Sequence, residues 1–581
     1  MLSYRKLAMR VLGRPLHTEG IDSPRPASQR AAAFALTAAM LITLTAPAFA
    51  ETWYIENGDI TVKASGTEGK NTVSQGNKKD VEDTNTIITN QKTDTASSHT
   101  VTINANGKND KVEVTLKDVN IEANSGPALT SKGDVTLTLK GENHLTGGNG
   151  GRYGGSGITS NGSLTITGGE NDSLTAQGGS SADGGSGSYG GDGIGSSSGG
   201  LTISGGTVNA AGGSGSYGGS GICSSSDDLT ISGGTVNAAG GSGSYGGNGI
   251  YSRGGLTISG GTVTANGGGD GSNVRSGHGI YSNGSLTISG GSTVTANGGN
   301  GGNVSGDGIS SNGSVTISGG TVKAAGGDSK DGYGGDGIRS GGVVTISGNT
   351  VNAAGGYGGK VGGYGICSFD RVAISGGTVE AAGGNGSTGG GSGIYSSVID
   401  LSGSLELTAK AGSPNGKALL QAGHELDLDT IKDKLGPGAK VTVTDADGKV
   451  NQVSIPRPVE PEEPVIPEES SSSSDGGSAT PSTPASPLPG LTVTDKSGAV
   501  ISYTSTQSGN TLTVCVGRFT ASLRASLSAL RQLRAEGIET ITFQTILCST
   551  TLSVDELLAM GGEDAEAVLT HRLTDSSLTV G

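Results

Sequence analysis

Tyrosine recurs in this sequence at fixed positions around a repeated Gly-Ile step. The tyrosines that stand five residues before such an isoleucine are Tyr153, Tyr189, Tyr217, Tyr245 and Tyr333. Others, such as Tyr251 and Tyr281, directly follow it. An exposed tyrosine offers its ring to the C–H face of a sugar and its hydroxyl to the sugar's rim. The candidates for carbohydrate binding are therefore Tyr189, Tyr217, Tyr245, Tyr251 and Tyr281. The alternative is that these rings only cover glycine-rich loops.

Aspartates form a second candidate site, two residues before the same isoleucine. Only Asp307 and Asp336 occupy this position in neighbouring repeats. Because Ca²⁺ prefers several oxygen ligands, the pair is a candidate for one Ca²⁺ site. The alternative is that both aspartates only form turns. No cofactor is expected to be required, and Ca²⁺ is the one ion we consider.

No catalytic constellation stands out. The six histidines are His17, His99, His144, His278, His424 and His571. Their positions have neither metal-ligand spacing nor a defensible Ser/His/Asp order. We therefore expect a protein that is not an enzyme. The alternative from a different class is a polysaccharide lyase or glycoside hydrolase.

These residues are positioned by a repeat with a period of about 28–30 residues. Its isoleucines are Ile158, Ile194, Ile222, Ile250, Ile280, Ile309, Ile338, Ile366 and Ile394. Each repeat contains three short segments in which apolar and polar residues alternate, the pattern of strands with one buried face. Three strands per period predict one coil of a right-handed parallel β-helix.

One repeat shows which side chains should point inward. They are Ile250 in the first strand, Leu256 and Ile258 in the second, and Val263 and Ala265 in the third. Stacked coils would then align the outward Thr of the second strand into a flat hydroxyl array. Such an array resembles the ice-binding face of some β-helical antifreeze proteins, although Thr is also an ordinary choice for an exposed strand.

The composition agrees with a repetitive β-structure. The chain has 111 glycines among 581 residues, five Phe and one Trp, which excludes a mostly helical protein and a large aromatic core. Glycine does not fall at every third place, so collagen is excluded too. A disordered Gly/Ser linker is the competing interpretation, but disorder does not require in-phase apolar pairs in every repeat.

The chain divides into six parts by composition and pattern. We expect a signal peptide at 1–50, an N-terminal cap with imperfect coils at 51–146, the Gly-rich β-helix at 147–412, a C-terminal cap at 413–455, a Pro/Glu/Ser linker at 456–490 and a small α+β domain at 491–581. In the last part, one amphipathic helix should carry Leu523, Leu527 and Leu530 on one face and end near Gly537. Cys515 and Cys548 there are a candidate disulfide, and the alternative is that they stay unpaired.

Export is predicted from the apolar run Ala31–Leu44 and the small-x-small motif Ala48–Ala50. We expect a secreted protein that can associate with the cell surface, and a monomer. The net charge of −15 argues against nucleic acid as a partner. No second apolar run is long enough to span a bilayer, so no membrane insertion is expected after signal cleavage.

Three motifs resemble one known family. They are the opening Trp53–Ile60, the segment Val114–Ile121, and the repeated Gly-Ile-x-Ser…Leu-Thr-Ile-Ser-Gly-Gly-Thr-Val. Together, over roughly residues 51–410, they resemble the extracellular carbohydrate-binding β-helix domains of clostridial and related Gram-positive surface proteins. The resemblance implies a non-catalytic β-helix that binds acidic plant polysaccharides and Ca²⁺. The family's Asp-Gly-Ile step is kept only at Asp192, Asp307 and Asp336.

The resemblance and the tyrosine columns together favour a carbohydrate-binding, adhesin-like protein whose partner is a polysaccharide or a host or plant glycan. A third hypothesis is a structural spacer at the cell surface that displays the domain at 491–581.

Overall fold

The computed structural model describes residues 51–65, 69–105, 110–181, 187–269, 274–456, 490–495, 498–501, 503–508, 510–516, 518, 520–545, 549–560, 566–572 and 575–580. These residues form two compact units, and the division between them falls inside 457–489. The predicted signal peptide, most of the predicted linker, and Cys548 lie outside the described residues.

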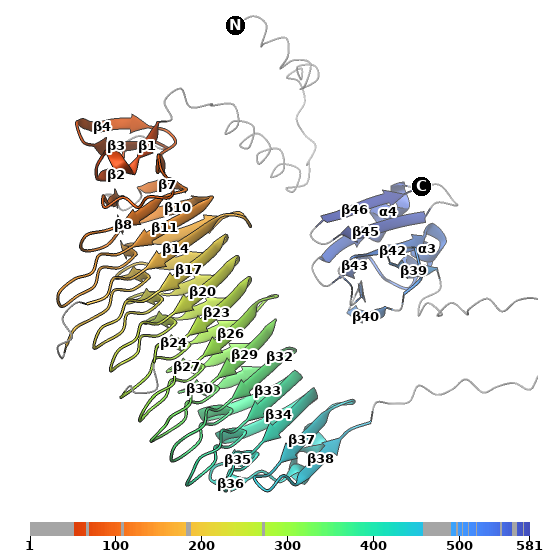
Figure 1. The fold of residues 1–581 in the computed structure, drawn as a ribbon. Coiled ribbons are helices and arrows are strands. Elements are labelled where there is room, and N and C mark those ends of the chain that lie inside the picture. Colours follow the sequence, from red (N-terminus) through yellow and green to blue (C-terminus); the bar gives the residue numbers. More distant parts are fainter. Residues whose placement is uncertain are drawn as a thin grey trace, which may run out of the picture. The chain divides into compact units, whose positions relative to one another are not determined.

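The first unit is a parallel β-solenoid of about 14 turns, as predicted (Figure 1). Each central coil contributes one strand to each of three columns. The first column contains β12 (Ile158–Asn161), β15 (Ile194–Ser196), β18 (Ile222–Ser224), β21 (Ile250–Ser252), β24 (Ile280–Ser282), β27 (Ile309–Ser311) and β30 (Ile338–Ser340). The second contains β13 (Leu164–Gly168), β16 (Leu201–Ile203), β19 (Leu229–Ile231), β22 (Leu256–Ile258), β25 (Leu286–Ile288), β28 (Val315–Ile317) and β31 (Val344–Ile346). The third contains β14 (Ser173–Gln177), β17 (Thr207–Ala211), β20 (Thr235–Ala239), β23 (Thr262–Asn266), β26 (Thr293–Asn297), β29 (Thr321–Ala325) and β32 (Thr350–Ala354).

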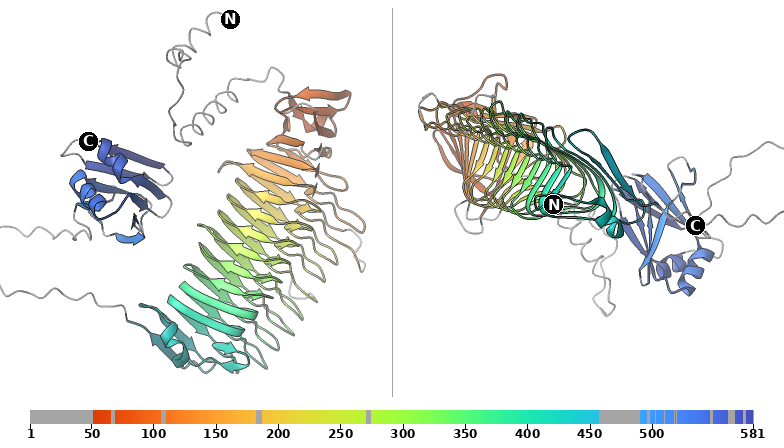
Figure 2. Two further views of the ribbon diagram at one scale, coloured as in Figure 1. Left: turned by 180° about the vertical axis from the view of Figure 1, so that it is seen from behind. Right: turned by 90° about the horizontal axis from the view of Figure 1, so that it is seen from below.

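The register places like residues above like residues, which confirms the predicted interior. Ile222 pairs with Ile250, Leu229 with Leu256, and Val236 with Val263. These side chains are fully buried, as are the equivalents in the other coils. The right-hand view in Figure 2 looks obliquely along the stack and shows the strands of successive coils following one another in the same order. Because their inward side chains are buried in every coil, the aliphatic core runs along the axis of the unit.

The glycine-rich loops are close-packed layers rather than loose connections. The N–H of Gly241 donates to the carbonyl of Gly219, and the N–H of Gly247 donates to that of Gly241. A Cβ added to Gly247 would lie only 1.9 Å from the carbonyl oxygen of Gly219. At the corner between the second and third strands, Gly261 has a φ of +78°, which L side chains rarely adopt. Glycine is therefore needed here for the stacking itself.

The coils begin earlier than the regular repeat. The early strands are β1 (Thr52–Tyr54), β2 (Ile60–Ala64), β5 (Ile87–Thr89), β6 (Val101–Asn104), β7 (Lys111–Lys117), β8 (Asn120–Glu122), β9 (Leu129–Lys132), β10 (Asp134–Lys140) and β11 (Glu142–Thr146), with a 3-10 turn η1 (Ile55–Asn57). They pair in parallel from β1–β5 and β2–β6 onward. Strand β3 (Asn71–Gln75) pairs antiparallel with β2, and β4 (Lys78–Asp83) pairs antiparallel with β3. They cover this end of the sheet, which would otherwise expose unpaired backbone groups.

The last coils are the two long strands β33 (Ile366–Ala382) and β34 (Ile394–Lys410), each of which runs through all three columns. They are followed by β35 (Leu419–Gln421), β36 (His424–Glu425), the 3-10 turn η2 (Leu428–Lys434), β37 (Lys440–Thr444) and β38 (Val450–Ser454). Strands β37 and β38 pair antiparallel as a hairpin around Gly448, within the predicted C-terminal cap.

The second unit has two four-stranded sheets. One contains β39 (Leu491–Thr494), β42 (Thr520–Ser526), β45 (Glu566–Arg572) and β46 (Asp575–Val580), and the other β40 (Thr504–Ser508), β41 (Thr511–Cys515), β43 (Thr540–Gln544) and β44 (Ser549–Ser553). Helix α3 (Leu527–Ala535) buries Leu527 and Leu530 as predicted. The prediction for Leu523 was wrong, because this residue lies in β42. The helix begins only after Ser526, whose hydroxyl accepts the N–H of Ala529. A second helix, α4 (Val554–Met560), was not predicted.

Candidate functional site

One flank of the solenoid carries three columns of outward residues, named here by their position relative to the repeat isoleucine. Column A stands five residues before it and contains Tyr153, Tyr189, Tyr217, Tyr245, Arg275, Val304, Tyr333, Val361 and Gly389. Column B stands two residues before it and includes Asp192, Ser220, Asn248, His278, Asp307, Asp336 and Tyr364. Column C directly follows it and includes Tyr251, Tyr281, Ser310 and Arg339.

The tyrosines of column A form the predicted ladder. The ring centroids of Tyr189 and Tyr217 lie 4.7 Å apart, those of Tyr217 and Tyr245 lie 4.8 Å apart, and the rings are nearly parallel. Tyr153 extends the ladder at 5.4 Å from Tyr189. All four side chains are exposed.

The ladder leaves little ring face for a sugar. Tyr189 and Tyr217 each have a tyrosine stacked on both faces, so they present only their edges and hydroxyls. At the outer end, the guanidinium of Arg152 lies 5.5 Å from the ring centroid of Tyr153. A pyranose therefore cannot stack on the inner rings, and the ladder can only offer its row of hydroxyls.

The ladder is interrupted after Tyr245, and a groove opens there. Column A continues with Arg275 and Val304 before Tyr333 resumes the aromatic series. The groove has a volume of about 540 Å³ and is lined by all three columns. Tyr281 and Arg339 of column C and Tyr333 of column A line it. Column B lies between these two columns in each coil, and its residues in the groove are called the floor here: His278, Asp307, Asp336 and Tyr364.

Five residues of column B, namely Asp192, Asn248, His278, Asp307 and Asp336, have the same structural task. The side chain of each accepts the backbone N–H of its counterpart in the next coil. The donor–acceptor distances are 2.7 Å for Ser220 to Asp192, 2.8 Å for His278 to Asn248, 2.9 Å for Asp307 to His278, 2.8 Å for Asp336 to Asp307 and 2.7 Å for Tyr364 to Asp336. A carboxylate, an amide and an imidazole therefore all serve equally well in this position.

The two aspartates of the groove are buried and have further polar partners. Asp307 is 7 % exposed and Asp336 is 4 % exposed. The Nδ1 atom of His278 lies 3.3 Å from Oδ2 of Asp307. The Nη1 atom of Arg339 donates to Oδ2 of Asp336 at 3.0 Å. The four side chains thus form one polar line across three coils.

The pKa values of the two carboxyl groups are displaced in opposite directions. Burial, together with the charge of Asp307, raises the pKa of Asp336 to about 7. Burial also acts to raise the pKa of Asp307, but its contact with His278, the N–H of Asp336 and the positive charge of Arg339 together outweigh burial and lower that pKa. Near neutral pH one carboxyl group is therefore ionised while its neighbour holds a proton for a substantial part of the time.

Column C forms the wall opposite Tyr333. The rings of Tyr251 and Tyr281 stack at 5.6 Å, and the imidazole of His278 packs on Tyr281 at 5.3 Å. The hydroxyl of Tyr281 accepts a hydrogen bond from Asn312. The predicted candidates Tyr251 and Tyr281 thus lie together, and Tyr281 lines the groove.

The pair predicted to bind Ca²⁺ is brought together, but its surroundings suit that ion poorly. A guanidinium occupies one oxygen of Asp336, and the raised pKa of this carboxyl weakens it as an anionic ligand. Within the described ranges, no three His, Cys, Asp or Glu side chains gather in a way that would hold a metal. We therefore derive no step through Ca²⁺.

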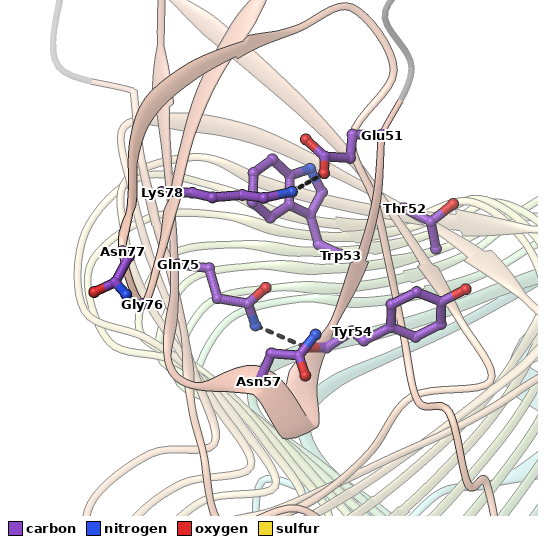
Figure 3. Close-up of a pocket in the computed structure, with 9 residues that line it drawn as sticks. All are labelled: Glu51, Thr52, Trp53, Tyr54, Asn57, Gln75, Gly76, Asn77 and Lys78. Carbon is purple, nitrogen blue, oxygen red and sulfur yellow. Dashed lines mark hydrogen bonds and ion pairs between the residues drawn. The ribbon is translucent and has the colours of Figure 1, made fainter.

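A second cavity, of about 480 Å³, lies at the N-terminal end of the solenoid (Figure 3). Its lining includes the rings of Trp53 and Tyr54. Trp53 is 1 % exposed, and its indole N–H donates to Asp83. Lys78 lies over this ring and forms an ion pair with Glu51. The indole face is thus covered, and these contacts close the end of the solenoid rather than build a binding site.

The cysteines add no reactive centre to the flank. Burial raises the pKa of the thiols of Cys223 and Cys367, so both stay protonated at neutral pH. Cys515 lies in β41 with its sulfur 3.5 Å from Oε1 of Gln544. Because Cys548 is outside the described residues, its disulfide with Cys515 stays a prediction.

The sequence reasoning missed the groove and four of the residues that make it. His278, Arg339, Tyr333 and Tyr364 each stand at a repeat position that carried a candidate in another coil. The signal was present in the columns, since His278, Asp307 and Asp336 follow one another in column B. What the sequence did not show is that the gap in column A uncovers them.

Comparisons with protein-family models, with curated proteins and with solved structures find no match to this chain. The resemblance to carbohydrate-binding β-helix domains therefore stays a prediction. None of the helices in the described parts of the chain is long and apolar enough to cross a membrane.

Proposed function

We propose that this protein is exported and binds an extended polysaccharide along the flank formed by columns A, B and C. The observation that carries the proposal is the groove, where the exposed side chain of Tyr333, half-buried tyrosines and a polar floor meet in one place. Tyr333 is 56 % exposed, and its neighbours in column A are Val304 and Val361 rather than other rings. Its faces are therefore not taken up by ring stacking.

The direction of the ligand follows from the repeat. Successive coils present equivalent groups at steps of 4.7–4.8 Å in the ladder. A linear sugar chain laid along the axis would meet the same kind of group once per coil, whereas a chain laid across the flank would meet it once only. We expect the groove to hold the chain and the hydroxyl row of Tyr189, Tyr217 and Tyr245 to extend the contact.

The proposal also covers localisation and partner. The predicted signal peptide supports secretion, and the acidic net charge of −15 does not favour nucleic acid. We propose a polysaccharide of host or plant origin as the ligand and an adhesin-like role at the cell surface.

Binding is tested on a glycan array with the full chain that begins at residue 51. We expect Tyr333→Ala to reduce affinity about tenfold or more, because the loss of a stacked sugar removes roughly 1–2 kcal/mol. Tyr357→Ala is the matched control, since Tyr357 is 48 % exposed but does not line the groove.

Three outcomes are decisive. Binding that weakens in Tyr333→Ala alone supports the proposal, and an array with no glycan above background contradicts it. If deletion of 491–581 abolishes binding while Tyr333→Ala has no effect, the solenoid is a spacer that displays the second unit.

A further inference from the structure

The floor of the groove holds two carboxyl groups that the fold does not need. The task of column B is to accept one N–H from the next coil, and Asn248 does this with an uncharged amide. Asp307 and Asp336 do the same with groups whose ionisation is opposed by burial. The raised pKa of Asp336 means that its ionised form is less favourable in the fold than in the unfolded chain, so an amide at this position would be more stable at neutral pH. Residues that lower stability in this way are typical of functional sites.

The pair differs from the other aspartate of this column. Asp192 has Ser156 and Ser220 as its column neighbours and does not line the groove. Asp307 and Asp336 stand in consecutive coils, line the same groove, and have different partners, an imidazole and a guanidinium. When the surroundings of two carboxyl groups push their pKa values apart, one commonly acts as a general acid and the other as an ionised carboxylate at the same active site.

We propose that the groove hydrolyses a glycosidic bond of the bound polysaccharide, with Asp336 as the general acid and Asp307 as the nucleophile. This inference rests on the proposed function, because the polysaccharide must occupy the groove. It replaces the sequence-based expectation that the protein is not an enzyme.

The spacing of the coils selects the mechanism. Asp307 and Asp336 stand at the same position of consecutive coils, whose backbones lie roughly 4.8 Å apart, and the N–H of Asp336 donates to Oδ1 of Asp307 at 2.8 Å. Glycosidases that pass through a covalent intermediate have carboxyls about 5–5.5 Å apart, whereas those that place a water between them need about 6.5–9.5 Å. A pair one coil apart therefore points to the covalent route and to retention of configuration at the anomeric carbon.

Each step balances with water as the only co-reactant. In the first step Oδ2 of Asp307 forms a bond to the anomeric carbon, the glycosidic C–O bond breaks, and Asp336 gives its proton to the leaving oxygen. In the second step Asp336 takes a proton from water, the water oxygen attacks the anomeric carbon, and the ester to Asp307 breaks. Both carboxyl groups return to their starting states.

His278 and Arg339 are positioning residues in this scheme. The Nδ1 atom of His278 accepts the backbone N–H of Asp307 at 2.9 Å, so the imidazole positions the backbone that carries the nucleophile. Arg339 holds Oδ2 of Asp336, and its guanidinium also lies 4.9 Å from the ring centroid of Phe369. The wall residues Tyr281 and Tyr333 would hold the sugar rings on either side of the bond.

The test compares three asparagine variants of the full chain from residue 51. An asparagine side chain can still accept the backbone N–H of the next coil, as Asn248 does, but it has no carboxyl group to ionise or to give a proton. We expect Asp307→Asn and Asp336→Asn to lower the release of reducing ends from the polysaccharide that binds best on the array by about 100-fold or more. Asp192→Asn is the matched control and should keep full activity.

Two further readouts separate catalysis from a structural role. NMR of the first product should show the configuration of the substrate, and a 2-deoxy-2-fluoro glycoside with a good leaving group should label Asp307. The rate should also fall as pH rises through about 7, where Asp336 loses its proton. The charged and titratable groups near this carboxyl are Asp307, Arg339, Cys367 and Tyr364.

The outcomes distinguish the two proposals. A polysaccharide that binds the groove without release of reducing ends overturns the hydrolase and leaves the binding function intact. Hydrolysis that survives Asp307→Asn and Asp336→Asn, or an inverted product, overturns the assigned roles. The absence of both binding and hydrolysis overturns both proposals.

Discussion

At the scale of one residue, Asp192 of column B accepts a hydrogen bond in the fold, while burial disfavours its charged form. Its Oδ1 accepts the N–H of Ser220, while burial raises its pKa to about 6. Its pKa in the unfolded chain is near the ordinary value of 3.8. The stability that this group contributes is therefore complete below pH 3.8 and is lost as the pH rises through about 6.

The prediction for this residue has a definite sign. Asp192→Asn keeps the hydrogen bond and removes the ionisation, so it should stabilise the solenoid at pH 8 by up to about 3 kcal/mol. Little change is expected at pH 4, where the aspartate is protonated. Urea unfolding at the two pH values measures the difference.

The reciprocal change is the control for this prediction. Asn248→Asp introduces a carboxyl into the same column and should destabilise the solenoid at pH 8 but not at pH 4. Equal effects of either variant at both pH values would show that burial does not disfavour the carboxylate here.

At the scale of the element, the loops that close each coil are as tightly constrained as the strands. Gly247→Ala would place its Cβ 1.9 Å from the backbone oxygen of Gly219, and backbone cannot move aside in a stacked coil. We expect a loss of about 3 kcal/mol or more in the free energy of unfolding. Chemical denaturation of the variant measures this loss.

The matched control is Gly291→Ala, where the added Cβ meets nothing within 4 Å. This change should stay within about 1 kcal/mol of the original protein. If both glycines tolerate alanine equally, the loops are not the close-packed layers described above.

Strand β45 of the second unit carries a buried histidine that should make this unit sensitive to acid. The imidazole of His571 contacts the hydroxyls of Thr545 and Thr550 and the ring of Phe543. Burial lowers the pKa of His571 below its ordinary value of 6.5. The unfolded chain therefore binds the proton more readily, and the stability contributed above pH 6.5 is lost as the pH falls below it.

Hydrogen exchange of the full chain checks this at pH 7.5 and pH 5. Peptides from 520–545 should exchange faster at the lower pH after correction for the intrinsic rate, while those from 366–410 should not. His571→Gln should remove the difference, and His424→Gln, at an exposed site in the first unit, should keep it. Unchanged protection of 520–545 at pH 5 would refute the role of His571.

At the scale of the whole molecule, the repeat determines the first unit far more directly than the second. The Leu-Thr-Ile and Thr-Val segments recur at the same place in each repeat and predict which side chains face the axis. Stacking requires equivalent positions of successive coils to face the same way, so each repeat reinforces the prediction from the others. In the second unit no repeat reinforces the signal. The step from strand β42 to helix α3 at Ser526 was missed because Leu523 fits the apolar spacing of both elements.

The candidate site was predictable only in part for a related reason. The periodicity placed the tyrosines of column A one above the other, and it placed Asp307 next to Asp336. The groove depends instead on departures from the repeat, namely Arg275 and Val304 where other coils carry tyrosine. A departure has no periodic signal of its own, and its effect becomes visible only when the neighbouring columns are seen together.

The central claim is that a polysaccharide lies in the groove of the first unit. Hydroxyl-radical footprinting of the full chain, with and without the polysaccharide selected on the array, tests this claim directly. With the polysaccharide bound, Tyr333 and Tyr281 should become protected from oxidation, while Tyr357 should react as fast as it does without the polysaccharide. Protection of Tyr357 with no change at Tyr333 and Tyr281 would contradict it.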